Sequence, residues 1–149
     1  ANKLTNKEFV SEADVLIVYS TDSYYYRALT TPADQAAREK FTRNLEEVIC
    51  YKLHESLMRC GIVYDSIYEQ ELEVCDINRY KCVIFANSNM ITPENLKKYK
   101  DITKNTMAVY LNGHGYCDGK TISLQNISDA TGMNIVKKLE EISSELKGE

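Results

Sequence analysis

The sequence predicts an α/β fold, a three-layer sandwich in which helices cover both faces of a mainly parallel sheet. Three short apolar runs, at residues 15–19, 82–86 and 107–111, fit strands that are buried on both faces. Stretches with helical spacing separate them, and this alternation is typical of a parallel sheet. The 149 residues suffice for one domain with a full core. We therefore expect a single domain over residues 1–149.

The first half of the chain is expected to run strand, helix, strand. Residues 1–12 form a polar lead-in to the first strand, and the Thr-Pro pair at residues 31–32 is a strong helix start. An apolar stripe with helical spacing occupies residues 41–60, and Gly61 is a natural stop for that helix. The partly alternating segment 62–68 predicts the second strand.

The second half follows an acidic connector at residues 69–76 and adds two more strands with helices after each. A second Thr-Pro start predicts a helix over residues 92–105, and a short helical turn is expected at 127–131, closed by Gly132. Apolar spacing over residues 134–149 predicts a C-terminal helix. Right-handed crossovers favour the strand order 2-1-3-4, the flavodoxin-like arrangement.

Composition excludes several classes of function. A net charge of −4 without a dense Lys/Arg cluster argues against a nucleic-acid partner. No apolar run approaches the roughly 18 residues of a membrane span, and no secretion signal begins the chain, so we expect a cytoplasmic protein. The five cysteines form no C-x-x-C motif and the two histidines add no zinc spacing. We expect buried, reduced thiols and neither a metal nor a cofactor.

Any ligand site is expected outside the carboxyl ends of the strands, near the switch between the first and third strands. The ligand-binding candidates in the three loops there are Ser20, Asp22, Asn87, Asn89, Asn112, His114 and Tyr116. The alternative is that these side chains satisfy backbone groups of the loops. The loop after the first strand has no glycine, and its helix is expected about ten residues later, which disfavours a phosphate or flavin site.

Two further sets of side chains are candidates for function. Cys117 and His114 lie three residues apart on a Gly-rich loop, where a histidine could activate a thiol nucleophile, although no third orienting group is evident. Structural loop residues are the favoured alternative for this pair. The run Tyr24, Tyr25 and Tyr26 cannot be buried on one face, so at least one ring is expected on the surface. These tyrosines are interface candidates, with a lid over the next helix or a sugar-stacking platform as alternatives.

The order of these segments resembles the class I glutamine amidotransferase-like superfamily. The likeness is closest to the trimerisation domain, an accessory domain of bacterial β-galactosidases and related glycoside hydrolases. The segments that carry it are residues 13–20, 57–65, 80–87, 109–116 and 126–133. The resemblance implies an accessory domain beside a catalytic barrel that this chain lacks.

The same resemblance implies that glutaminase activity is absent. Active amidotransferases carry a cysteine on a Gly-x-Cys-x-Gly elbow after the strand that corresponds to residues 107–111. Here that position holds Leu111 or Gly113, and the chain has no histidine after His114. We expect a non-catalytic accessory or oligomerisation domain. Because the chain starts at Ala1 without Met, we expect it to be cut from a larger glycoside hydrolase. Its partners would be further copies or a neighbouring catalytic domain.

Two other functions stay open on the sequence. The first is a domain that binds or senses a carbohydrate or another small molecule at the carboxyl edge of the sheet. The second is a Cys-dependent hydrolase that uses Cys117 and His114.

Overall fold

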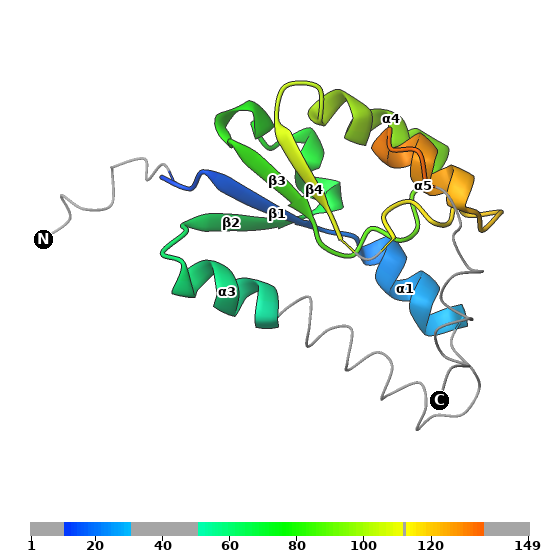
Figure 1. The fold of residues 1–149 in the computed structure, drawn as a ribbon, viewed down its shortest axis with the longest axis horizontal. Coiled ribbons are helices and arrows are strands. Elements are labelled where there is room, and N and C mark those ends of the chain that lie inside the picture. Colours follow the sequence, from blue (N-terminus) through cyan, green and yellow to red (C-terminus); the bar gives the residue numbers. More distant parts are fainter. Residues whose placement is uncertain (1–10, 31–50, 112, 136–149) are drawn as a thin grey trace, which may run out of the picture.

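A computed structural model describes residues 11–30, 51–111 and 113–135, and the fold is built on one parallel sheet (Figure 1). Its strands are β1 (Val15–Tyr19), β2 (Tyr64–Tyr68), β3 (Cys82–Phe85) and β4 (Met107–Tyr110). All three strand pairings are parallel, and the order is β2-β1-β3-β4. The predicted fold class and strand order are confirmed.

Helices lie on both faces of this sheet (Figure 1). The described elements between and after the strands are α1 (Thr21–Thr30), α3 (Leu53–Arg59), α4 (Pro93–Ile102), α5 (Leu124–Thr131) and the 3-10 turns η2 (Glu69–Glu73) and η3 (Ile77–Arg79). In Figure 1, α3 runs along the β2 side of one face, whereas α4 and α5 cover the other. The two 3-10 turns replace the acidic connector expected between the second and third strands.

The core divides into two clusters because β1 buries side chains alternately on its two faces. Leu16 and Val18 pack into the larger cluster, where they meet Phe85 of β3. Ile17, which points the other way, packs with Ala86 and with partly buried side chains of α3. The side chains on both faces of β1 are thus shielded from water, as the continuous apolar run of this strand requires.

The helix α3 is fastened to the sheet by the side chain of His54. Its Nε2 lies 2.5 Å from the hydroxyl oxygen of Tyr19 on β1, and its Nδ1 lies 2.7 Å from that of Tyr64 on β2. In the neutral ring one nitrogen donates and the other accepts, so both hydrogen bonds form together. These contacts fix α3 beside β2.

The prediction for the segment after β1 was wrong. Residues 20–26 were expected to form a loop, with a helix from residue 32, but α1 begins at Thr21 directly after the strand. Ser20 caps it, because its Oγ accepts the backbone N–H of Ser23 at 3.0 Å, and Asp22 places a negative charge in the first turn. The expected helix start at residues 31–32 lies outside the described residues.

The other helix boundaries follow the predicted signals more closely. Thr92 caps α4 by accepting the N–H of Asn95, and Gly61 and Gly132 end α3 and α5 in the left-handed conformation. The helix expected at residues 127–131 starts earlier, at Leu124, because Ser123 caps it. The described residues end at Ile135, and the chain is not helical there. Residues 136–149 of the predicted C-terminal helix lie outside the described residues.

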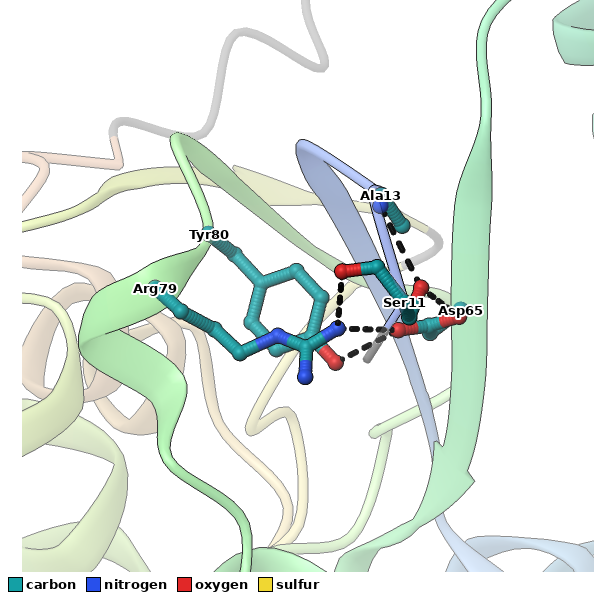
Figure 2. A network of polar contacts seen from close by, with 5 residues as sticks. All are labelled: Ser11, Ala13, Asp65, Arg79 and Tyr80. Carbon is teal, nitrogen blue, oxygen red and sulfur yellow. Dashed lines mark hydrogen bonds and ion pairs between the residues drawn. The ribbon is translucent and has the colours of Figure 1, made fainter. Parts of the chain in front are cut away.

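A polar network at the amino ends of the strands ties three segments together (Figure 2). The Asp65 carboxylate on β2 accepts hydrogen bonds from Ser11 at 2.8 Å, Arg79 at 2.9 Å and Tyr80 at 2.7 Å. Ser11 also accepts the N–H of Ala13, which leads into β1. Burial raises the pKa of the Tyr80 hydroxyl, and the bond to Asp65 adds to this effect. The network therefore ties the segment before β1 and the end of η3 to β2.

The cysteines of the described residues are all free, but they differ in exposure. Cys82 and Cys117 are buried, Cys75 is half-buried and Cys60 is exposed, so the expectation of buried thiols fails at Cys60. Cys50 lies outside the described residues. Within the described ranges, no helix is both long and apolar enough to cross a membrane.

Candidate functional site

Buried polar side chains join the carboxyl ends of β1 and β3. Asn87 is buried after β3, and its Oδ1 accepts the backbone N–H of Ser20 at 2.7 Å while its Nδ2 donates to the carbonyl of Ser20 at 3.2 Å. The Ser23 hydroxyl accepts the N–H of Met90 at 2.9 Å and donates to the carbonyl of Met90 at 3.1 Å. Ser20 and Asn87, both predicted ligand-binding candidates, are thus bonded to each other and to the backbone.

Replacement of Asn87 by alanine is expected to destabilise the fold by about 2 to 3 kcal/mol, because the buried N–H of Ser20 would lose its acceptor. Chemical denaturation of the wild type and the variant measures this difference. The matched control is Gln125→Ala, which removes an exposed amide that bonds only to Asp129 among the described contacts. A loss at Asn87 no larger than at Gln125 would contradict the assignment of this bridge.

Sequence reasoning missed a buried carboxylate, that of Glu69 in η2, which lies against the start of α1. Its Oε2 accepts the hydroxyl of Tyr99 on α4 at 2.7 Å, and its Oε1 accepts the backbone N–H of Asp22 at 3.2 Å. Burial raises the pKa of Tyr99, and the charge of Glu69 raises it further. A helix N-terminus favours an anion, and here the chain itself supplies one. Because α1 begins directly after β1, its N-terminus is close enough to the β1 loop for a phosphate site. The Glu69 carboxylate, however, already lies at that N-terminus.

His114 lies in a cage of aromatic rings. It is 1% exposed, and its ring centroid lies 5.0 Å from that of Phe85, 5.7 Å from Tyr99 and 4.5 Å from Tyr110. Neither ring nitrogen has a hydrogen-bond partner in the structure. Burial alone lowers the pKa of His114 to about 3, so the imidazole is neutral at physiological pH. Its contacts are those of a core side chain.

Cys117, the other half of the predicted catalytic pair, makes different contacts. It is 3% exposed, and its Sγ accepts the backbone N–H of Gly119 at 3.3 Å. A hydrogen bond with the Cys117 thiol raises the pKa of the Tyr26 hydroxyl, with burial as the second cause. Because the nitrogens of His114 make no hydrogen bond, the structure does not join the thiol to the imidazole.

The remaining sequence candidates are exposed, half-buried or outside the described residues. Tyr24 and Tyr25 are exposed on α1, with their rings edge to face at 5.6 Å, which confirms that part of the tyrosine run reaches the surface. Tyr116 is also exposed. The backbone carbonyl of Asn89 accepts the N–H of Cys117 at 2.9 Å, and Asn112 lies outside the described residues.

An open groove of about 200 Å³ lies between α4 and α5, next to this edge. Its apolar lining includes Ile91, Pro93 and Leu96, and its polar lining includes Asp118, Asn126 and Asp129. Backbone N–H groups of Lys120 and Thr121 bond to the Asp118 carboxylate and lower its pKa. In the part of the chain that the structure describes, no cluster of three or more His, Cys, Asp or Glu side chains could hold a metal ion.

Comparison with known proteins identifies structural relatives only. No protein-family model matches the sequence, and a search of curated proteins finds no significant match. The crystal structure of β-galactosidase from Bifidobacterium adolescentis is similar over 71% of this chain and 44% of that chain, with a TM-score of 0.52 and 14% sequence identity. Gan42B, a GH42 β-galactosidase, matches over 76% of this chain and 16% of that chain, with a TM-score of 0.44 and 18% identity.

The first of these matches shows a shared fold. The chain spans less than half of the length of either β-galactosidase.

Proposed function

We propose that this chain is a non-catalytic accessory domain of a glycoside hydrolase and that it acts through self-association. The proposal rests on the burial of the polar side chains at the carboxyl edge of the sheet, which are those of Ser20, Asn87, Glu69 and His114. The first three are hydrogen-bonded to other groups of the chain. In an α/β sheet this edge is the usual place for a ligand. Here its side chains stabilise the junction of β1, β3 and α4 instead.

Two further points support this assignment. The shared fold with a β-galactosidase of more than twice the matched length fits a domain of such an enzyme. If the chain is similar to the amidotransferases, the elbow position after β4 holds Leu111 or Gly113, and neither residue offers a nucleophile. An enzyme that keeps this domain would therefore use it for assembly rather than for chemistry.

Light scattering of the purified chain tests self-association. We expect a mass above the 17.1 kDa of one chain that rises with concentration. A constant mass of one chain up to millimolar concentration would contradict the proposal.

Thiol labelling tests the non-catalytic assignment. Iodoacetamide is expected to react with exposed Cys60 at the rate of an ordinary thiol and with buried Cys117 much more slowly, because only a solvent-accessible thiolate is alkylated. Peptide mapping after timed labelling reports each cysteine separately, and unfolded protein provides the control in which the two rates converge. Faster labelling of Cys117 than of Cys60 in the native protein would favour the Cys-dependent hydrolase instead.

A second candidate function is carbohydrate binding, which the groove between α4 and α5 favours. Apolar side chains on one side and the carboxylates of Asp118 and Asp129 on the other suit the apolar face and the hydroxyl groups of a sugar. A thermal-shift screen with galactose, lactose and related sugars would detect binding, and Asp129→Ala should abolish any shift. The absence of a shift across the panel would leave the accessory role alone.

A further inference from the structure

Three buried polar atoms lie at the carboxyl edge, where the segment after β3 meets the segment after β4. They are the hydroxyl oxygen of Ser88 and the two ring nitrogens of His114, and none of them has a hydrogen-bond partner among the described residues. Ser88 is 0% exposed and His114 is 1% exposed. Because an unpartnered buried polar group costs free energy, nearly all such groups in folded proteins bond to another protein group or to an ordered water.

Two contacts bring these side chains to the same place. The carbonyl of Ser88 accepts the N–H of Gly115 at 2.7 Å, so the backbone of Ser88 lies against the residue that follows His114. Both side chains also approach Tyr99 on α4, whose ring centroid lies 5.7 Å from that of His114. Burial raises the pKa of the Tyr99 phenol, and the Ser88 hydroxyl is close enough to oppose that rise, although the two groups do not form a hydrogen bond of normal geometry.

The groups around this region do not satisfy the imidazole. The Tyr99 hydroxyl donates its proton to Glu69 at 2.7 Å, so its oxygen can only accept a further hydrogen bond. The imidazole also contacts the rings of Phe85 and Tyr110. Burial is the one cause that lowers the pKa of His114, so no charged or hydrogen-bonding side chain of the described ranges reaches its nitrogens. The imidazole therefore needs a partner that those ranges do not supply.

We propose that one internal water molecule binds between the Ser88 hydroxyl and a ring nitrogen of His114. Water fits these groups because a hydroxyl and a neutral imidazole each offer a donor and an acceptor, and water complements either. Internal waters typically make about three hydrogen bonds to groups that would otherwise be unsatisfied. Ser88 and His114 supply two of these bonds, and the oxygen of Tyr99 is an acceptor for the third.

The water joins the elements of this edge through one chain of hydrogen bonds. The chain runs from Glu69 in η2 through Tyr99 on α4 and the water to His114 after β4, with Ser88 after β3 as a branch. This edge is the usual ligand site of an α/β sheet, and here its polar groups bond to one another and to water. The inference does not depend on self-association, so either proposal can fail without the other.

A high-resolution crystal structure of the wild-type chain tests the site directly. We expect one isolated density peak at roughly 2.7 to 3.2 Å from both the Ser88 hydroxyl oxygen and a ring nitrogen of His114. A region without such a peak would overturn the proposal, and so would a direct hydrogen bond between Ser88 and His114.

Oxygen-17 relaxation dispersion tests the same site in solution, because it counts the water molecules that stay inside the protein for longer than the protein tumbles. His114→Phe keeps an aromatic ring but removes both nitrogens, so the count should fall by one. The matched control is His54→Phe, because the nitrogens of His54 already bond to Tyr19 and Tyr64; its count should equal that of the wild type. Ser88→Ala removes the other partner of the water and should give the same loss as His114→Phe.

Circular dichroism verifies that each variant is folded. Equal counts in the wild type, His114→Phe and Ser88→Ala would overturn the proposal. An equal loss in His54→Phe would also overturn it, because the loss would then not be specific to this site.

A serine beside a histidine is also the arrangement of a nucleophile and its base. A fluorophosphonate probe, which reacts with activated serines, distinguishes that arrangement from a water site. We expect no labelling of Ser88 in the native protein, because its side chain is out of reach of the probe. Peptide mapping identifies any labelled residue, and labelling of Ser88 would overturn the water site in favour of a hydrolase.

Discussion

Gly115→Ala is expected to destabilise the fold by about 2 to 5 kcal/mol. An alanine Cβ at this position would lie 2.5 Å from the Cβ of Ala130 on α5, much closer than two non-bonded carbon atoms can approach. The backbone also has φ of +72°, in the left-handed region. The left-handed conformation costs about 1 to 2 kcal/mol for alanine and overpacking a further 1 to 3 kcal/mol. Urea denaturation of both proteins measures the sum.

Gly113→Ala is the matched control for this prediction. Gly113 has a similar φ of +70°, but the nearest atoms to its added Cβ lie 3.9 Å away. Only the backbone term applies there, so the loss should be about 1 to 2 kcal/mol. The double variant Gly115→Ala, Ala130→Gly should recover part of the difference. Equal losses at the two glycines would show that the loop does not pack against α5 as described.

Acidification is expected to destabilise the protein through His114. Burial lowers its pKa to about 3 in the folded state, against roughly 6.5 in the unfolded chain. Between these values the unfolded state binds more protons, so stability is complete above pH 6.5 and falls as the pH falls towards 3. The full effect amounts to about 3 to 5 kcal/mol. Denaturation midpoints at a series of pH values measure it.

His114→Phe separates this contribution from that of the carboxylates. The substituted ring keeps the contacts with Phe85, Tyr99 and Tyr110 but cannot titrate. The variant should therefore lose less stability than the wild type between pH 6.5 and pH 3. Parallel pH profiles for the two proteins would contradict the burial of a neutral imidazole. NMR titration of the His114 ring would report its pKa directly.

The strands were predictable because their physical signal is local. Residues 15–19 and 82–86 are continuous apolar runs, as a strand covered on both faces requires, and both strands formed within one residue of the expected bounds. The strand order followed from right-handed crossovers, which leave few arrangements for this chain. Edge strand β2 starts at Tyr64 rather than at residue 62, because its partner β1 begins at Val15.

The site was harder to predict because its main contacts join distant segments. Residues 21–30 contain three tyrosines and few strong helix formers, and the Thr-Pro pair at residues 31–32 offers a second capping signal that competes with Ser20. Glu69 resembled part of an acidic surface connector, and its burial depends on Tyr99, thirty residues later in the chain. Its place directly after the second strand was the one signal that could have identified it. The burial of His114 likewise depends on rings from β3, α4 and β4.

Hydrogen exchange at two protein concentrations tests the central claim most directly, because it reports each segment separately. If the chain acts through self-association, the amides of at least one described segment away from the carboxyl edge should exchange more slowly at high concentration. Those of residues 20–26 and 113–118, at the carboxyl edge, should exchange equally at both concentrations. The same exchange rates in every segment at both concentrations would contradict the account.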